Sequence, residues 1–490
     1  MSFAGTNNAL AWAHFRLRGG WARSVLVTAA IILVLAGIII TMHRLNPDDA
    51  DKILFGWTTG LLAVQAACLV LYIPGRIGQI IRADVQSKMI ESHRLMPTPP
   101  AHAVAGYIMG AATQPLVFCC GIFFLGALVA AAAGVHVPRW AFASAVLFAF
   151  GVFVWIVTAY TSLGGRAGGA IMMAMLMIPW LTQGYVLTLL PGTTVILSPV
   201  IGQSVFDFRT GIGPGPGGGY VLPATYAMAF AAQCFFGTLC FIGASRAYRS
   251  PVEISLDTIL GLCFLLGWVA VSFTALRAWD DFRPRGWSPG KVTADLQVCA
   301  TLIAALLVAI APLAANARQR ANWRRHVELR DPYPMRRPIP IAAVIAVALL
   351  AIVTLPFAPT DVARPATGVM LRTAAIVAIA LVGLYFFFDC CYALAKTAGV
   401  AATIWIVFTW GVPIGMDFAH YNMSGSSGGE MLGRFSTGSP LGALMLLWTR
   451  DKNAGPVDIN FGLGVQILFA LIPMCLWLFV FPRRRNGSRL

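Results

Sequence analysis

Charged residues are scarce in this chain. Only 11% of its 490 residues are charged, whereas an ordinary soluble domain carries about a quarter. Hydrophobic residues make up 58% of the chain, and the mean hydropathy is +0.76. Since backbone polar groups must be satisfied internally in lipid, we predict an all-helical, polytopic integral membrane protein rather than a soluble protein with an anchor.

Acidic residues are rarer still, with 19 Asp and Glu against 35 Lys and Arg and a formal net charge of +16. In a soluble protein this balance would suggest nucleic acid as a partner. In a membrane protein, basic residues collect in cytoplasmic loops and fix the orientation of the spans. We therefore expect membrane lipids as partners and no nucleic acid.

Several chemical signatures are missing. The P-loop pattern G-x-x-x-x-G-K-[ST] does not occur, and the nearest string, GWSPGKV at 286–292, has the wrong spacing. The ten cysteines show neither zinc spacing nor the pattern of a secreted disulfide framework. The run GSSG in the polar segment 416–460 is not a nucleophile elbow. The lone His420 with Asp417 and Glu430 favours a solvated loop over a metal or hydrolase site. We predict no cofactor, no metal and no enzymatic activity.

Long apolar runs are abundant. A helix needs about 20 apolar residues to cross the hydrocarbon. Since the first run is too long for a signal-peptide core and no small-residue cleavage site closes it, we count it as a span. The third run contains Pro115, which predicts a tilted or broken helix. Twelve runs are candidate spans: 24–41, 54–73, 104–133, 140–161, 169–190, 222–244, 257–276, 294–315, 339–358, 373–394, 398–415 and 461–481.

The distribution of Lys and Arg predicts the orientation. With the N-terminus inside, alternation of twelve spans places both dense basic clusters, 318–337 and 483–489, on the inner side. The segment Arg277–Lys291 opposes this assignment with four basic residues on the outer side. We predict a multi-pass protein of the cell (inner, cytoplasmic) membrane with both termini in the cytoplasm.

A polar segment at about 76–100 separates the second predicted span from the third. Ile77, Ile81, Val85 and Met89 recur every four residues, which predicts an amphipathic helix of about four turns at the cytoplasmic surface. Prolines end it because they lack an amide donor. Such a helix rests on lipid headgroups or docks into a soluble partner, and its mixed charge slightly favours the partner. The candidate docking residues are Arg82, Asp84, Lys88, Glu91, Arg94, Leu95 and Pro97. His93 and His102 flank the end of the helix, and we interpret them as surface residues.

This segment resembles the ABC-2-type permease family, the membrane subunits of type-2 ABC exporters. Members of that family carry a short cytoplasmic coupling helix between their second and third spans. It ends in a Glu, a Pro six positions later and a Gly nine positions after that, and this chain has Glu91, Pro97 and Gly106 at those positions. The chain departs from the family in having Tyr107 where Lys is frequent, and Lys88-Met89 where Gly-Thr/Ser is usual. The resemblance is clearest over residues 1–249.

Family members usually have six spans and work as pairs, and this chain has two candidate halves, 1–249 and 250–490. Ser198-Pro199 lies between the fifth and sixth predicted spans, and Ser439-Pro440 lies between the eleventh and twelfth. The family often has such a step in a partly re-entrant outer segment. A divergent repeat and six added spans of other purpose are both open, since Ser-Pro is also a common turn dipeptide.

Acidic residues inside the predicted spans are few. Asp389, in YFFFDCCYALAK, is the candidate, since an intramembrane carboxylate is functional by default. It lies within about two turns of the predicted inner end of its span, and we favour pairing with Lys396 or water as the explanation.

The resemblance implies a permease subunit of an ATP-driven exporter that takes energy from a separate ABC ATP-binding subunit, with a homodimer or heteromer as the working unit. Two alternatives stay open. A twelve-span secondary carrier would place ionisable residues at mid-membrane. An envelope scaffold or membrane-embedded enzyme would cluster polar residues at one interface.

Overall fold

The computed structural model describes residues 8–16, 19–95, 97–135, 137–163, 223–249, 257–277, 341–354, 367–394, 404–417, 435–449 and 459–487. Throughout these ranges every regular element is a helix and no strand occurs, which confirms the all-helical fold. The chain divides into two compact units. The first comprises Met1–Leu187, Thr193–Ser255 and Trp279–Trp287, and the second comprises Thr188–Gly192, Leu256–Ala278 and Ser288–Leu490. That the second is a divergent repeat of the first stays a prediction.

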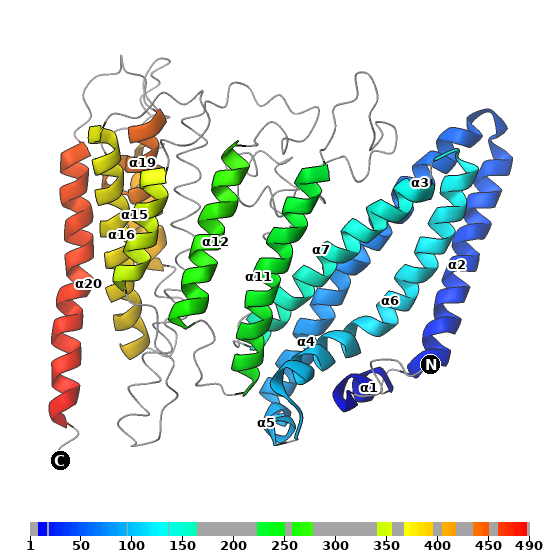
Figure 1. Ribbon diagram of the computed structural model, residues 1–490, viewed down its shortest axis with the longest axis horizontal. Helices are drawn as coiled ribbons and strands as arrows, with labels where there is room; N and C mark the ends of the chain where they lie inside the picture. Colours follow the sequence, from blue (N-terminus) through cyan, green and yellow to red (C-terminus); the bar gives the residue numbers. More distant parts are fainter. Residues whose placement is uncertain are drawn as a thin grey trace. The chain divides into compact units, whose positions relative to one another are not determined.

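The first unit is organised around one long helix, α6, which packs against α1, α2, α3, α4, α7 and α11 (Figure 1). A π-helical turn, Cys68–Tyr72, joins α3 directly to α4. The helices of this unit are α1 (Ala9–Arg16), α2 (Gly20–Leu45), α3 (Ala50–Ala67), α4 (Ile73–Gln86), α5 (Met89–Arg94), α6 (Pro100–Ala132), α7 (Val137–Leu163) and α11 (Pro223–Arg249).

Large aromatic side chains fill the core of the first unit. Trp140 is fully buried against Gly126, where an added Cβ would overlap the indole ring, and the Trp140 Nε1 donates to the Phe123 carbonyl at 3.0 Å. Trp155 is also buried and donates to the Leu69 carbonyl at 2.6 Å. Leu69 lies in the π-helical turn, and such turns leave carbonyls open to outside donors. The glycine and the π turn thus make room for two indole rings.

The second unit contains α12 (Thr258–Arg277), α15 (Ile341–Thr354), α16 (Thr367–Leu394), α19 (Pro440–Thr449) and α20 (Ile459–Gly487), with a π-helical turn at Val407–Gly411 and a 3-10 turn at Ser436–Gly438. Its apolar core includes Ile376, Leu384 and Leu444. α16 and α20 approach closely, since an added Cβ at Gly383 would lie 3.3 Å from the Cα atom of Ala470.

Among the described residues, six helices are long and apolar enough to cross a membrane: Gly20–Leu45, Pro47–Gln86, Pro100–Ala132, Val137–Leu163, Tyr226–Arg249 and Gly368–Cys391. They coincide with six of the predicted runs, which supports a membrane protein. Shorter apolar helices occur at Ile259–Val271, Ile404–Asp417 and Asn460–Leu476. The predicted spans 169–190 and 294–315 lie outside the described residues, so the count of twelve stays a prediction.

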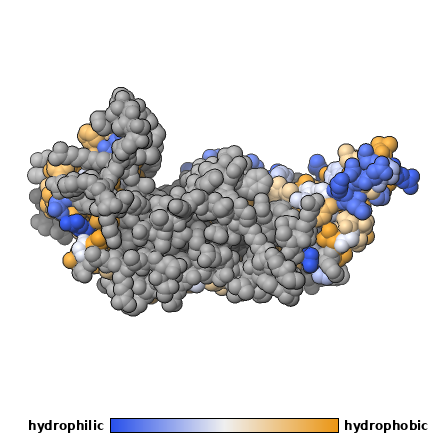
Figure 2. All heavy atoms as spheres, turned by 90° about the horizontal axis from the view of Figure 1, so that it is seen from above, coloured by the Kyte–Doolittle hydropathy of each residue, from blue (hydrophilic) through white to orange (hydrophobic). Residues whose placement is uncertain are grey.

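Polar residues gather at the connection between α2 and α3, visible as a hydrophilic cluster beside hydrophobic residues in Figure 2. Asp48, Asp49 and Lys52 are exposed there, and Lys52 Nζ lies 2.7 Å from an Asp49 carboxylate oxygen. α2 itself buries only Gly20, Ser24 and Ile39 against the described part of the chain. An apolar helix with so few buried residues is suited to contact with lipid.

Candidate functional site

The predicted coupling segment forms two helices instead of one. α4 continues the second candidate span without a break, and Ile77 and Ile81 within it are fully buried. The helix ends where the Ser87 hydroxyl donates to the Ala83 carbonyl at 2.8 Å and Lys88 takes the left-handed conformation, with φ 59°. Such a residue is a common way to end a helix. The four-residue periodicity extends across this turn, so it did not reveal the break.

The turn and α5 present one exposed side. We define the α5 surface as Lys88, Met89, Glu91, Leu95 and Pro97, all of which are exposed. Leu95 is 87% exposed and Met89 is 52% exposed. In Figure 1, α5 lies at the same end of the first unit as α1. The α5 surface thus combines two apolar side chains with charges of both signs, which suits a protein partner better than a purely basic face would.

Other residues predicted for docking face the protein interior. The Asp84 side chain is buried at the junction of α4 and α6, where the Tyr107 hydroxyl donates to Asp84 Oδ2 at 2.7 Å. His93 Nδ1 lies 3.0 Å from that hydroxyl and 3.7 Å from Asp84 Oδ2. His14 Nε2 lies 4.0 Å from the same carboxylate oxygen. These four residues, the Asp84 cluster, connect α1, α4, α5 and α6.

Arg94 joins α5 to α11. Its Nε donates to the Tyr248 carbonyl at 2.5 Å and its Nη2 donates to the Ala247 carbonyl at 3.3 Å. These carbonyls belong to the last turn of α11, where a cation is favoured by the helix dipole and by the unpaired carbonyl groups. The Arg82 side chain binds within its own helix, α4, since its Nε donates to the Gly78 carbonyl at 3.0 Å. Neither guanidinium is part of the α5 surface.

Gly106 has a packing role. An added Cβ there would lie 2.5 Å from Asn8 Oδ1, and one at Gly110 would lie 2.9 Å from the Cβ atom of His14. The two glycines form a small-xxx-small pair that allows α1 to lie against α6. Asn8 begins α1, accepting from the Ala11 amide at 3.1 Å and donating to the His102 carbonyl. Gly106 thereby brings His14 within reach of Asp84.

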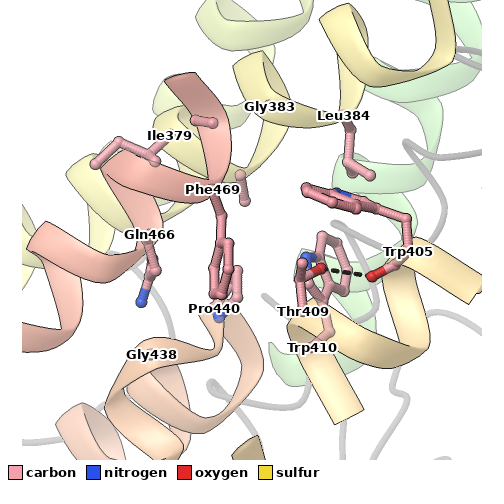
Figure 3. A pocket seen from close by; sticks show the side chains of 12 residues that line it. Ile379, Gly383, Leu384, Trp405, Thr409, Trp410, Gly438, Pro440, Gln466 and Phe469 are labelled. Carbon is pink, nitrogen blue, oxygen red and sulfur yellow. Dashed lines mark hydrogen bonds between the residues drawn. The ribbon is translucent and has the colours of Figure 1, made fainter. Parts of the chain in front are cut away.

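The Ser439-Pro440 step lies in a second buried polar site. Ser439 accepts from the Gly442 amide at 3.4 Å, as a helix N-cap does, and Pro440 takes the first position of α19. The Ser439 hydroxyl also donates to the Trp410 carbonyl at 2.7 Å. Pro440, Thr409, Trp410 and Gln466 are among the residues that line a small cavity of about 30 Å³. Figure 3 shows this cavity from close by. The companion step, Ser198-Pro199, lies outside the described residues.

Asp417 completes this second site. Its carboxylate accepts from the Ser436 amide at 2.6 Å and from the Phe435 amide at 3.3 Å. Gln466 Nε2 donates to the Thr437 carbonyl at 2.8 Å. We call Asp417, Ser436, Thr437, Ser439 and Gln466 the Ser439 cluster, and all five are buried. The segment 416–460, interpreted above as a solvated loop, is not a loop throughout, since Asp417 is buried and α19 covers Pro440–Thr449. Residues 418–434 and 450–458 lie outside the described residues.

Asp389, the intramembrane candidate, is 2% exposed within α16. Its neighbour Cys390 donates to the Pro473 carbonyl of α20 at 3.4 Å. Lys396, the expected partner of Asp389, lies outside the described residues. Across the described ranges, no group of three or more His, Cys, Asp or Glu side chains is arranged to hold a metal ion.

Sequence reasoning missed two members of the Asp84 cluster, and its interpretation of His93 as a surface residue was wrong, since the His93 side chain packs against Tyr107 and Asp84. Tyr107 was identified only as a departure from a family pattern, and His14 was not identified at all. The nearest signal was the Gly106 and Gly110 spacing, which marks where another helix lies against α6. No protein-family model matches the chain, and searches of curated proteins and of solved structures find no similar protein.

Proposed function

We propose that this chain is the membrane-spanning permease subunit of an ATP-driven exporter and receives energy from a separate ABC ATP-binding subunit through the α5 surface. The observation that carries the proposal is the two-sided construction of α5. One side is exposed and carries Lys88, Met89, Glu91 and Leu95. The opposite side is bonded through His93 and the Arg94 guanidinium to other helices.

The arrangement suits the transmission of force. Arg94 links α5 to the end of α11, and His93 links it to Tyr107 on α6. A partner that pushes on the α5 surface therefore acts on the ends of two candidate spans through short hydrogen bonds. Conformational switching commonly uses such rigid-body displacement between two discrete arrangements. In this proposal, closure of the ATP-binding subunits moves α5, and the attached spans rearrange around the transport path.

The absence of a P-loop from the sequence is consistent with a separate ATP-binding polypeptide. The Glu91, Pro97 and Gly106 spacing is consistent with the ABC-2-type permease family. A membrane location, a homodimeric or heteromeric working unit and cytoplasmic termini belong to the same proposal. The chain would act as a transport subunit without catalytic residues of its own.

Co-purification from native membranes in mild detergent tests the proposal. The variant Glu91→Arg/Leu95→Asp changes two exposed residues of the α5 surface. Its matched control is Asp48→Arg/Leu45→Asp, which makes the same kinds of change at exposed residues of the α2–α3 connection. We expect a P-loop ATPase to co-purify with the wild type and the control and to be lost from the α5 variant. An ATPase that is retained by the α5 variant, or absent from the folded wild type, contradicts the proposal.

One observation favours a second candidate, a proton-coupled carrier. Asp84 is a buried carboxylate near the imidazoles of His14 and His93, and proton relays use such groups. This candidate predicts substrate uptake into proteoliposomes driven by a pH gradient without ATP, and loss of that uptake in Asp84→Asn. The exporter proposal predicts no uptake driven by the gradient alone.

A further inference from the structure

A cavity of about 950 Å³ lies in the first unit between α2, the α3–α4 junction and α6. This volume is within the range of sites for small ligands, about 300–1,000 Å³. Of the described residues that line it, two are charged, Arg23 and Arg76, and none is acidic. The remaining wall is mostly apolar and includes Val27, Ile31 and Phe118. The cavity therefore combines positive charge with a hydrocarbon-like surface.

The two arginines are held in place by their own helices. The Arg76 guanidinium lies 5.6 Å from the centre of the Tyr72 ring, one turn earlier. Its Nε atom is buried and has no hydrogen-bond partner among the described residues. The Arg23 side chain folds against Gly19, where an added Cβ would lie 2.6 Å from Arg23 Cδ and where φ is 97°. A buried donor without a partner is unfavourable, so an acceptor in this cavity would stabilise it.

The cavity is open to the surface of the protein along the exposed side of α2. Val27 is 47% exposed and Ile31 is 40% exposed, although both line the cavity. At the cavity wall, α2 and α6 approach closely at Thr28, a lining residue, and Gly121, where an added Cβ would lie 2.8 Å from the threonine methyl group. In a membrane, an amphiphile could enter from the lipid and lie with its tail along Val27 and Ile31. Its head would then reach the guanidinium groups.

We propose that this cavity binds a membrane lipid with an anionic phosphate headgroup. The phosphate accepts charge-assisted hydrogen bonds from Arg76 and Arg23, since guanidinium and phosphate groups match in geometry. The acyl chain occupies the apolar wall and supplies packing to α2, which buries few of its own residues. The lipid is a resident ligand of this protein, and the proposal does not depend on the exporter proposal.

Native mass spectrometry of the purified full chain in detergent tests the site. The probes are dioleoyl phosphatidylglycerol, dioleoyl phosphatidylcholine and glycerol phosphate. We expect a single phosphatidylglycerol adduct, preferred about tenfold over phosphatidylcholine. Arg76→Gln and Arg23→Gln should each remove most of this preference, whereas Arg44→Gln, an exposed arginine at the other end of α2, should leave it unchanged.

A second pair of variants tests the tail and guards against loss of folding. Ala67→Trp fills the cavity, and Ala63→Trp places the same ring one turn away on α3, outside the cavity lining. We expect Ala67→Trp to weaken lipid binding and Ala63→Trp to leave it unchanged. If glycerol phosphate displaces the lipid as well as free phosphatidylglycerol does, the site binds a free anion and the lipid proposal is wrong. Equal lipid selectivity in Arg76→Gln and wild type would also overturn it.

Discussion

The Asp84 cluster and the Ser439 cluster both place several polar side chains inside the protein, but these side chains bind different kinds of partner. In the Asp84 cluster, side chains from four helices meet one another, and the carboxylate accepts from the Tyr107 hydroxyl. In the Ser439 cluster, side chains bind the backbone, since Asp417 accepts from two amides and Ser439 donates to a carbonyl. Backbone partners fix one chain path, whereas side-chain partners join separate helices and can exchange. We infer that the first cluster suits a moving joint and the second suits a fixed turn.

The largest effect is expected in the fixed turn. Asp417→Ala leaves the Ser436 and Phe435 amides without their carboxylate, and hydrogen bonds to charged groups contribute about 1.5–3 kcal/mol each. We expect the free energy of unfolding in detergent to fall by about 3 kcal/mol. Asp417→Asn keeps one acceptor oxygen and should recover part of the loss. An unchanged unfolding midpoint in Asp417→Ala would refute the assignment of Asp417 as the anchor of this turn.

Asp84→Ala should have the next largest effect. It removes the hydrogen bond that the buried Tyr107 hydroxyl donates to a carboxylate, and a hydrogen bond to a charged group contributes about 1.5–3 kcal/mol. We expect a loss of about 2 kcal/mol in unfolding free energy, measured by denaturant unfolding in mixed micelles. The double variant Asp84→Ala/Tyr107→Phe removes both partners and should recover part of it. If the two single changes simply add, Asp84 and Tyr107 are not coupled as their geometry requires.

Ser439→Ala is expected to have a smaller effect. The substitution removes an N-cap and the hydrogen bond to the Trp410 carbonyl, and loss of an N-cap costs about 1 kcal/mol. Thermal unfolding in detergent should show a small decrease in midpoint, and Ser439→Thr, which keeps the hydroxyl, should show less. A loss as large as that of Asp417→Ala would mean that the cap, rather than the carboxylate, anchors the turn.

The sequence predicts those parts of the molecule whose causes are local. Six long helices follow from runs of apolar residues, because the length needed to cross a membrane is fixed. The start of α19 at Pro440 was not predicted, because the segment 416–460 was interpreted as a solvated loop, although a capping serine followed by proline is a local signal for a helix start. The separate packing of α4 and α5 was not predicted, because Lys88 is a residue type that rarely takes a positive φ.

The Asp84 cluster could not be assembled from the sequence. Tyr107 is 23 residues from Asp84, and the Arg94 guanidinium reaches a carbonyl 154 residues away. Asp84 lies seven residues after Ile77, so periodicity places it on the same face of α4 as the buried isoleucines, but it does not tell which helix covers that face. Only tertiary packing distinguishes Asp84, which faces inward, from Glu91, which is exposed.

The smallest effect is expected at the residue that starts the helix beside each cluster, Lys88 before α5 and Pro440 in α19. Pro440 presets its own φ at the start of α19, whereas the chain reaches α5 through Lys88 at φ 59°. The left-handed conformation is unfavourable for a residue with a Cβ by about 1 kcal/mol, although glycine adopts it freely. Lys88→Gly should therefore raise the unfolding midpoint slightly, after allowance for the greater entropy of unfolded glycine. Lys88→Val should lower it, since β-branched residues resist positive φ. If both substitutions lower the midpoint equally, contacts of the lysine side chain contribute more to stability than the positive φ at residue 88 costs. The connection between α4 and α5 then does not depend on a strained backbone.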